Sequence, residues 1–285
     1  MNYKNFIEEK LNIKVNDLIP LQGGMMNESF LVATNDKKYI AYFPPIHVKG
    51  MVDRNLELFH LNLCSQNNLT SKNVFFDTDS GIKINEYIEG KSINLVDDFD
   101  TKKVAKLLKK FHSLKPLSGI KYAPFDRLKD YEKEALKYQV LSKDYYVMKD
   151  LFLSNYDFLN SFDLVISHND AQRSNIVRSV DDEYFLIDFE FAADNDEYYD
   201  IATFGNNNID EGVKLLYDYL DGNVKDVDLK RYYLWRMYIS MQWYLVAISK
   251  HHKGEGAIHN FNFLDVAEHF INNALLCYNR LNGLK

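Results

Sequence analysis

The sequence is poor in the features that organise several classes of protein. It contains two cysteines among its 285 residues, Cys64 and Cys277, and neither belongs to a CxxC pattern or lies near clustered histidines. Neither a disulfide framework nor a cysteine-based zinc site is therefore supported. Both cysteines fall on predicted helices, where we expect them to be packing residues.

Positive charge is also scarce. The formal net charge is −7 and the isoelectric point is near 5.6. Proteins that bind nucleic acids rely on clustered lysine and arginine to neutralise phosphates. We therefore expect no nucleic-acid partner.

No apolar run is long enough for a targeting or membrane-spanning segment. The first fourteen residues, MNYKNFIEEKLNIK, carry charge within the first four and lack the apolar core of a signal peptide. The most apolar-looking stretch, Tyr232 to Ile248, has Arg236 and Gln242 near its middle, which is too polar for a span of that length. We predict that this stretch is a buried helix and that the protein is cytoplasmic, without membrane insertion.

The chain is long enough for one large domain or two lobes, and with 46% hydrophobic residues it can bury a sizeable core. Short strand signals separated by turn residues fill the first part, together with one helix of apolar residues at helical spacing. From Thr101 onward helical periodicity dominates. We predict an α+β chain in which residues 1–90 form a lobe with a small antiparallel sheet and residues 91–285 form a larger, mainly helical lobe.

The most informative segment is Ile166 to Ile176, ISHNDAQRSNI, which is followed further along by Asp188. Its polar side chains come directly after apolar strands, where a rigid scaffold presents loop residues to ligands. Phosphoryl transfer needs a carboxylate that orients an attacking hydroxyl and accepts its proton, and Asp170 suits this role. It also needs oxygen ligands for Mg2+, which Asn175 and Asp188 would supply from two neighbouring loops.

Each of these residues, taken alone, is more often a turn or cap residue than a catalytic group. The joint pattern HxDxxxxN, followed by an apolar run and DFE, has several fixed positions in the strand–loop–strand context that the chemistry requires. We therefore interpret Asp170, Asn175 and Asp188 as the catalytic centre of a small-molecule kinase that uses ATP and Mg2+. We expect the ring of His168 to hold the loop backbone rather than to act as a base.

These segments resemble the choline/ethanolamine kinase family, a branch of the protein-kinase-like superfamily that also contains the aminoglycoside phosphotransferases. HNDAQRSNIV is similar to the family pattern H-N-D-x-Q-x-x-N-I, and LIDFEFAADNDEYYDIATF is similar to its L-I-D-F-E segment ending in D-I/L-A. The resemblance implies a two-lobed protein-kinase-like fold with the active site between the lobes. It also implies that Asp200 braces the catalytic loop from the start of a helix.

The resemblance further assigns nucleotide-binding positions. The segment Gln22 to Phe30 matches the family's nucleotide loop, whose glycines let backbone N–H groups approach phosphate. The segment Asn85 to Gly90 matches the hinge, where backbone groups meet the adenine edge. The implied nucleotide-binding residues are Gly23, Gly24, Asn27, Glu57, Glu86 and Ile88.

One position departs from the family pattern. The third strand of the family carries a lysine or arginine that contacts the α- and β-phosphates and pairs with a helix glutamate, which here is Glu57. This chain has Tyr42 at that place, and tyrosine cannot supply the positive charge. A nearby cation substitutes, the strand register differs, or nucleotide binding is weakened. The candidate substitutes are Lys38, Lys49 and Arg54.

The resemblance implies choline as the phosphoryl acceptor. Trp235 to Gln242 resembles the W-x-x-W-x-x-x-Q stretch that supplies aromatic walls to the family's choline pocket, with Tyr238 in place of the second tryptophan. Residues three apart share one face of a helix, and a quaternary ammonium binds well to aromatic faces within about 6 Å. An aromatic pair at this spacing is also common in helix cores. The implied substrate-binding residues are Asp170, Gln172, Glu190, Phe191, Trp235 and Tyr238.

The identity of the amine stays open. Glu190 or Glu197 would add negative charge for the substrate's cation. Asn207 stands near the place where eukaryotic members carry a glutamate, and Asp210 or Glu211 would compensate. Ethanolamine, an aminoglycoside or another amino alcohol are therefore alternative substrates. A catalytically impaired ATP-binding module, suggested only by the missing strand cation, is the alternative from a different functional class.

Overall fold

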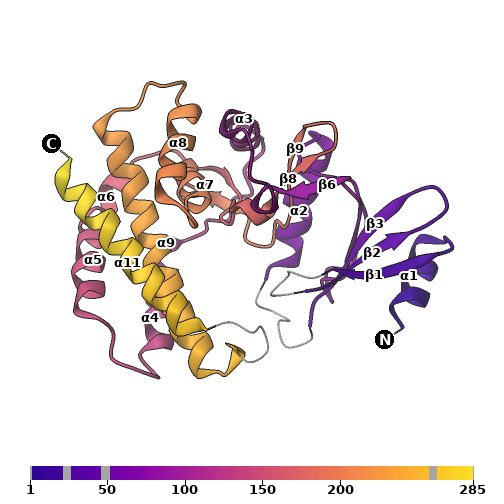
Figure 1. Ribbon diagram of the computed structural model, residues 1–285, viewed down its shortest axis with the longest axis horizontal. Coiled ribbons are helices and arrows are strands. Elements are labelled where there is room, and N and C mark those ends of the chain that lie inside the picture. The colour runs from indigo at the N-terminus through magenta and orange to yellow at the C-terminus, as the bar shows by residue number, and fades with distance from the viewer. Residues whose placement is uncertain (1, 22–26, 46–51, 257–261, 285) are drawn as a thin grey trace. The chain divides into compact units, whose positions relative to one another are not determined.

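The structure is a computed structural model that describes residues 2–21, 27–45, 52–256 and 262–284. The chain divides into two compact units, each assembled from two separate stretches of sequence (Figure 1). The predicted N-terminal lobe, residues 1–90, lies wholly within the first of them. Unit 1 comprises Met1–Phe99 with Arg173–Ala192, and unit 2 comprises Asp100–Gln172 with Ala193–Lys285.

Unit 1 is organised around a five-stranded sheet in which all neighbouring strands are antiparallel. The strand order is β1-β2-β3-β5-β4, so β5 lies between β3 and β4. The small antiparallel sheet predicted for this part of the chain is confirmed. The strands are β1 (Asp17–Leu21), β2 (Glu28–Ala33), β3 (Lys38–Phe43), β4 (Asn73–Phe76) and β5 (Lys83–Glu86).

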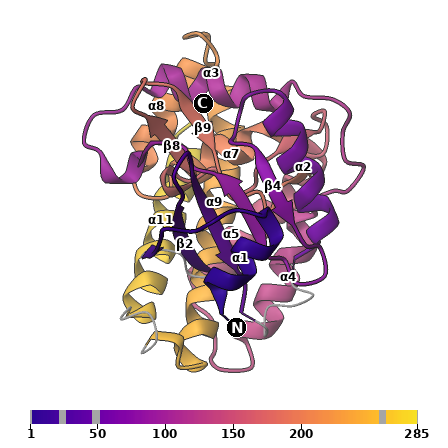
Figure 2. The same ribbon diagram turned by 90° about the vertical axis from the view of Figure 1, so that its right-hand side faces the viewer.

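One face of this sheet packs against helix α1 (Tyr3–Leu11), which Figure 2 shows lying over the strands. Val32 of β2, Ala41 of β3 and Ile84 of β5 are fully buried there together with Ile7 of the helix. Successive residues of a strand point to opposite faces of a sheet. The chain neighbours of Ala41 and Ile84 therefore point to the other face, away from α1.

Helix α2 (Arg54–Gln66) begins after Asp53, whose side chain accepts hydrogen bonds from the backbone of Asn55 and Leu56. This cap satisfies N–H groups that the first helical turn leaves without intrahelical partners. A second sheet, in the order β6-β8-β9, completes the unit. Its elements are β6 (Gly90–Ser92), β8 (Ile176–Ser179) and β9 (Tyr184–Leu186), with the short 3-10 helices η2 (Ile93–Leu95) and η3 (Arg173–Asn175).

Unit 2 is mainly helical, as predicted. The long helix α9 contacts α4, α5, α7, α8 and α11, and Figure 1 shows α11, in yellow, running alongside it. Strands β7 and β10 pair in antiparallel fashion beside α7 and α3. The elements are α3 (Thr101–His112), α4 (Pro124–Ala135), α5 (Lys143–Ser154), α6 (Tyr156–Leu159), β7 (Val165–Ser167), β10 (Ala193–Asn195), α7 (Glu197–Phe204), α8 (Ile209–Tyr219), α9 (Asp226–His252) and α11 (Phe263–Gly283).

Two expectations about packing are met. The stretch Tyr232 to Ile248 lies within α9 and is largely buried, with Arg236 fully enclosed. Cys64 and Cys277 are buried, unpaired residues of α2 and α11, which confirms their role in packing. No helix in the described part of the chain has both the length and the hydropathy that crossing a bilayer requires.

Candidate active site

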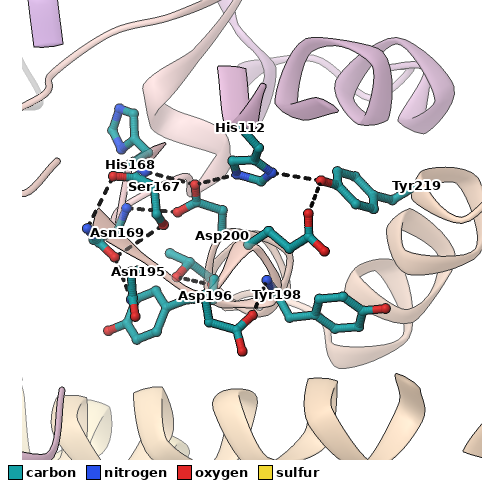
Figure 3. A network of polar contacts seen from close by, with 12 residues as sticks. His112, Ser167, His168, Asn169, Asn195, Asp196, Tyr198, Asp200 and Tyr219 are labelled. Atoms are coloured by element: carbon teal, nitrogen blue, oxygen red, sulfur yellow. Dashed lines mark hydrogen bonds and ion pairs between the residues drawn. The ribbon is translucent and has the colours of Figure 1, made fainter. Parts of the chain in front are cut away.

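The loop that carries Asp170 is fastened to helix α7 by one carboxylate. Asp200, fully buried in that helix, accepts a hydrogen bond from the backbone N–H of His168 through Oδ2 and another from Asn169 through Oδ1, each at 2.8 Å (Figure 3). Two charge-assisted bonds to consecutive N–H groups fix the direction in which the chain leaves β7. The bracing role predicted for Asp200 is confirmed.

A chain of polar contacts extends from Asp200 to helices α3 and α8. His112 Nε2 lies 3.0 Å from Asp200 Oδ2, and His112 Nδ1 lies 2.9 Å from the hydroxyl of Tyr219, which donates to Glu197 at 2.7 Å (Figure 3). Burial opposes ionisation of Asp200, but the hydrogen bonds and positive potential from the two histidines outweigh it and hold the pKa of its carboxyl below the usual value. The carboxylate is thus kept ionised where the loop needs an acceptor.

Asn169, the residue before Asp170, has an unusual backbone conformation. Its φ of 60° lies in the left-handed region, which asparagine tolerates better than most residues. Its side-chain oxygen accepts a hydrogen bond from Asn195 Nδ2 of β10 at 2.7 Å. Asp170 follows, half-buried, and accepts a hydrogen bond from Gln172 Nε2 at 3.2 Å. Two of the residues predicted to bind the substrate therefore lie side by side in unit 2.

The two predicted metal ligands lie together in unit 1. Strands β8 and β9 pair through Ile176 and Leu186, and the next rung is a hydrogen bond from Ile187 N–H to the carbonyl of Asn175 at 3.0 Å. Asn175 and Asp188, thirteen positions apart in the chain, thus sit at the same end of one hairpin. Asp188 also has a left-handed φ, 66°, a strained conformation that is found preferentially at functional sites.

This pair suits Mg2+ by its chemistry. A carboxylate and an amide offer oxygen donors, and Mg2+ commonly takes one or two protein ligands and completes its shell with water and phosphate oxygens. The described residues contain no group of three or more His, Cys, Asp or Glu side chains placed to hold a metal. Asn175 and Asp188 would therefore hold the ion together with the nucleotide rather than in a closed protein cage.

A buried lysine lies on the strand next to β3, opposite Tyr42. Tyr42 of β3 lies directly opposite Lys83 of β5 in the antiparallel register, on the sheet face away from α1. Lys83 Nζ lies 2.5 Å from Glu57 Oε1 of α2 and 3.1 Å from Asp188 Oδ1. Its ammonium is 4.9 Å from the centroid of the Tyr42 ring. Burial opposes its charge, but the carboxylates of Asp188 and Glu57 outweigh burial and raise the pKa of Lys83.

The three substitutes considered from the sequence therefore omitted Lys83. Lys38 is exposed and pairs with Glu89, whereas Arg54 does contact Glu57, at 2.6 Å. Lys49 lies outside the described residues, as do Gly23 and Gly24. The available signal was a lysine between two apolar residues of a strand, Ile82-Lys83-Ile84, but its relation to Tyr42 depends on a strand pairing that local sequence does not reveal.

The other predicted residues of unit 1 differ in their surroundings. Glu190 lies 3.9 Å from Arg54, and burial together with the nearby Asp188 charge raises the pKa of Glu190 to about 7. Glu86 pairs with Lys37 at 2.7 Å at the end of β5. Asn27, Ile88 and Phe191 are half-buried residues of the same unit.

The aromatic pair on α9 lies in a buried cluster of unit 2. The rings of Trp235 and Tyr238 are 5.9 Å apart, and both contact Phe152 and Tyr199 at centroid distances of 5.1 to 5.9 Å. These are direct packing distances for aromatic rings. The Trp235 Nε1 and Tyr238 hydroxyl groups are buried without a hydrogen-bond partner among the described residues. The two rings share one face, as their spacing predicts, and part of that face is polar.

The acidic residues considered for the amine differ in their surroundings. Glu197 is engaged with Tyr219, and Asp210 is an exposed partner of Arg280 at 2.6 Å. Asn207 is exposed and Glu211 is half-buried.

Comparison with known proteins agrees with this architecture. The sequence model of the family described as Choline/ethanolamine kinase matches residues 18–212, well over half of the chain. Protein LicA of Haemophilus influenzae is 26% identical over 193 residues, which are 64% of this chain. The match spans 55% of that relative's length.

Solved structures extend the likeness to nearly the whole chain. Choline kinase LicA from Streptococcus pneumoniae superposes with a TM-score of 0.75 at 25% identity, covering 96% of this chain and 99% of that one. A choline/ethanolamine kinase family protein from Mesorhizobium loti gives 0.77 at 15% identity, covering 92% and 88%. Spectinomycin phosphotransferase gives 0.66 at 12% identity, covering 96% and 97%. The last two share the fold, and the predicted protein-kinase-like α+β fold is confirmed.

Proposed function

The chain belongs to the choline/ethanolamine kinase family, whose members are phosphotransferases with alcohol acceptors, and we propose that it transfers the γ-phosphoryl group of ATP to the hydroxyl of choline. The proposal rests on two local arrangements, one in each unit. One is the Asp200-fastened loop that presents Asp170, and the other is the hairpin end that brings Asn175 beside Asp188. Phosphoryl transfer depends mainly on such positioning and on charge stabilisation.

Asp170 is the group that would take the proton. As the substrate oxygen attacks the γ-phosphorus, a new P–O bond forms, the bond to the β-phosphate oxygen breaks and ADP leaves, while the hydroxyl proton passes to the Asp170 carboxylate. Gln172 Nε2 donates a hydrogen bond to Asp170 at 3.2 Å, which limits the orientations that this carboxylate can adopt. Asn175 and Asp188 would hold Mg2+, which supplies neutralising charge for the phosphates.

The amine end of the substrate would meet the aromatic cluster on α9. Trp235 and Tyr238 would offer π faces for a quaternary ammonium, which cannot donate hydrogen bonds and is held by such faces. The cluster continues through Tyr199 to Tyr122. The guanidinium carbon of Arg127 lies 4.2 Å from the centroid of the Tyr122 ring. A cation against these rings is therefore compatible with their surroundings.

A primary amine such as ethanolamine is the second candidate. It donates hydrogen bonds and would pair with Glu190 or Glu197, the two carboxylates that the sequence suggested for the amine. An aminoglycoside or another amino alcohol would use the same carboxylates. These substrates share the chemistry at Asp170 and differ in what recognises the amine.

The test is ADP release by the purified protein with MgATP and a panel of choline, ethanolamine, thiamine and an aminoglycoside. We expect choline-dependent turnover, and we expect Asp170→Asn to lower kcat by at least about a hundredfold. Asp163→Asn, a change at an exposed aspartate of the same unit, is the matched control and should leave kcat unchanged. Turnover with another acceptor would keep the catalytic residues and reject the choline pocket. ATP binding without turnover on any acceptor would favour the impaired ATP-binding module.

A further inference from the structure

The face of the unit 1 sheet away from α1 holds a compact cluster of charges. Lys83 has only 4% of its side chain exposed and lies between the carboxylates of Glu57 and Asp188. Arg54 contacts Glu57 from the other side and Glu190 at 3.9 Å. Burying a lysine is unfavourable unless its charge is paired and hydrogen-bonded, and even a paired buried ion often stabilises a protein no more than an apolar residue would. The site therefore calls for an explanation of why an ammonium is placed there.

We propose that Lys83 is the residue that contacts the nucleotide phosphates, and that it acts from strand β5 because Tyr42 occupies the facing position on β3. This inference rests on the proposed function, since its ligand is the ATP of that reaction. In kinases of this general type, a lysine paired with a helix glutamate and a metal-binding aspartate must both be in place around the phosphates. Lys83 touches both acidic partners at once.

Charge and hydrogen-bond capacity favour this role. An ammonium has three donors, and among the described residues Glu57 and Asp188 are its hydrogen-bond partners. One donor therefore remains for a phosphate oxygen. The 3.1 Å contact with Asp188 places the ammonium beside the carboxylate that would hold the metal, and the metal in turn binds the same phosphates.

The strand register explains how the cation can change strands. Directly opposed residues of an antiparallel pair have Cβ atoms about 5 Å apart and point to the same face. An ammonium on a flexible side chain from position 42 or from position 83 can therefore reach the same point beside Glu57. The Tyr42 ring fills the space on β3. Its centroid lies 4.9 Å from Lys83 Nζ, a distance at which the face of the ring attracts the ammonium.

Arg54 is the rival cation within unit 1. Its Nη1 lies 2.6 Å from Glu57 Oε2, whereas Lys83 binds the other oxygen of the same carboxylate, Oε1. Its second carboxylate is Glu190 rather than Asp188. Arg54 therefore serves to position Glu57, and Lys83 is the cation aimed at the metal-binding aspartate.

The test compares nucleotides that differ in phosphate content. Calorimetry would measure the affinity of wild type and Lys83→Met for MgATP and for adenosine. Loss of one charge-assisted contact should weaken MgATP binding by about 10- to 100-fold, whereas adenosine affinity should change by less than about twofold. Lys10→Met on α1, whose exposed lysine lies 3.6 Å from Glu9, is the matched control and should bind both ligands as wild type does.

Moving the lysine from position 83 to position 42 tests whether either strand can supply the phosphate-binding ammonium. Tyr42→Lys combined with Lys83→Thr should bind MgATP at least about tenfold more tightly than Lys83→Thr alone, because the ammonium returns to Glu57 from the other strand. If the double variant binds MgATP no more tightly than Lys83→Thr while its adenosine affinity is intact, the inference is overturned. If Lys83→Met does not fold, Lys83→Gln, which keeps a donor for Glu57, serves the same comparison.

These outcomes separate the inference from the proposed function. Unchanged MgATP affinity in Lys83→Met, or an equal loss of adenosine affinity, overturns the role of Lys83 even when wild type phosphorylates choline. Lys83-dependent MgATP binding in a protein that phosphorylates no acceptor upholds that role and refutes the kinase assignment.

Discussion

Replacing Asp200 by asparagine should detach the catalytic loop while preserving the shape of the side chain. The carboxylate accepts three hydrogen bonds, from the backbone N–H groups of His168 and Asn169 at 2.8 Å each and from His112 at 3.0 Å. Asparagine keeps one acceptor oxygen and brings an NH2 group to the other position, where a backbone N–H already points. The residue is fully buried, so water cannot take over the lost role.

The size of the effect follows from these contacts. Leaving a buried donor without a partner costs about 1–3 kcal/mol, and bonds to a charged group are worth more than neutral ones. We therefore expect Asp200→Asn to lower the free energy of unfolding by about 2–4 kcal/mol. We also expect kcat to fall at least about a hundredfold, because a misplaced general base forfeits much of its catalytic contribution. MgATP affinity, which we propose depends on unit 1 residues, should stay within about twofold of wild type.

Urea unfolding and ADP release measure these quantities. Asp210→Asn is the control, because its carboxylate is exposed and pairs with Arg280 at the surface, where ion pairs contribute little. A fully active Asp200→Asn protein, or one no less stable than the control, would refute the bracing argument.

The pH dependence gives a second readout for the same variant. The pKa of Asp200 is lowered in the folded protein, so its stabilisation is complete above the ordinary aspartate pKa and is lost as the pH falls through the folded value. The stability gap between wild type and Asp200→Asn should therefore narrow below about pH 4. A gap that widens on acidification would contradict the sign of this linkage.

Three further predictions concern packing and charge. Gly212→Ala should destabilise by about 1–3 kcal/mol, because a Cβ there would lie 2.1 Å from the buried Tyr232 hydroxyl; Gly283→Ala, with nothing within 4 Å, is the control in urea unfolding. The pKa of Glu190 is raised to about 7, so the unliganded wild type should lose stability as the pH rises from about 4.5 through 7. Melting curves recorded across this pH range should show that Glu190→Gln removes this loss. Tyr238→Phe deletes a buried hydroxyl without a described partner, so thermal unfolding should show equal or higher stability, and a large loss would reveal a partner for that hydroxyl.

The strands and helices could be predicted because each depends on residues that are close together in the sequence. The alternation of strand and turn residues before Gly90 predicts the sheet of unit 1, and helical periodicity predicts the helices of unit 2. The bracing by Asp200 came from the family resemblance, and its contacts with the backbone of His168 and Asn169 confirm it.

What escaped prediction depends on pairings between distant segments. Lys83 lies opposite Tyr42 only because β5 inserts between β3 and β4 in the sheet, and no local pattern specifies that order. The contacts of His112 with Asp200 and Tyr219 likewise join helix α3 to residues of α7 and α8 that are 88 and 107 positions away in the chain. Such contacts follow from burial in three dimensions, which a linear pattern of polar and apolar residues does not encode.

The facing arrangement of Tyr42 and Lys83 also changes how relatives of this chain should be classified. When two opposed strand positions can deliver the same charge to one glutamate, a single alignment column is the wrong unit of comparison. A sequence without a basic residue on the third strand would be set aside as a pseudokinase by a one-column rule. Scoring both columns together would retain such sequences as candidate enzymes and restrict the pseudokinase label to chains with no cation at either position.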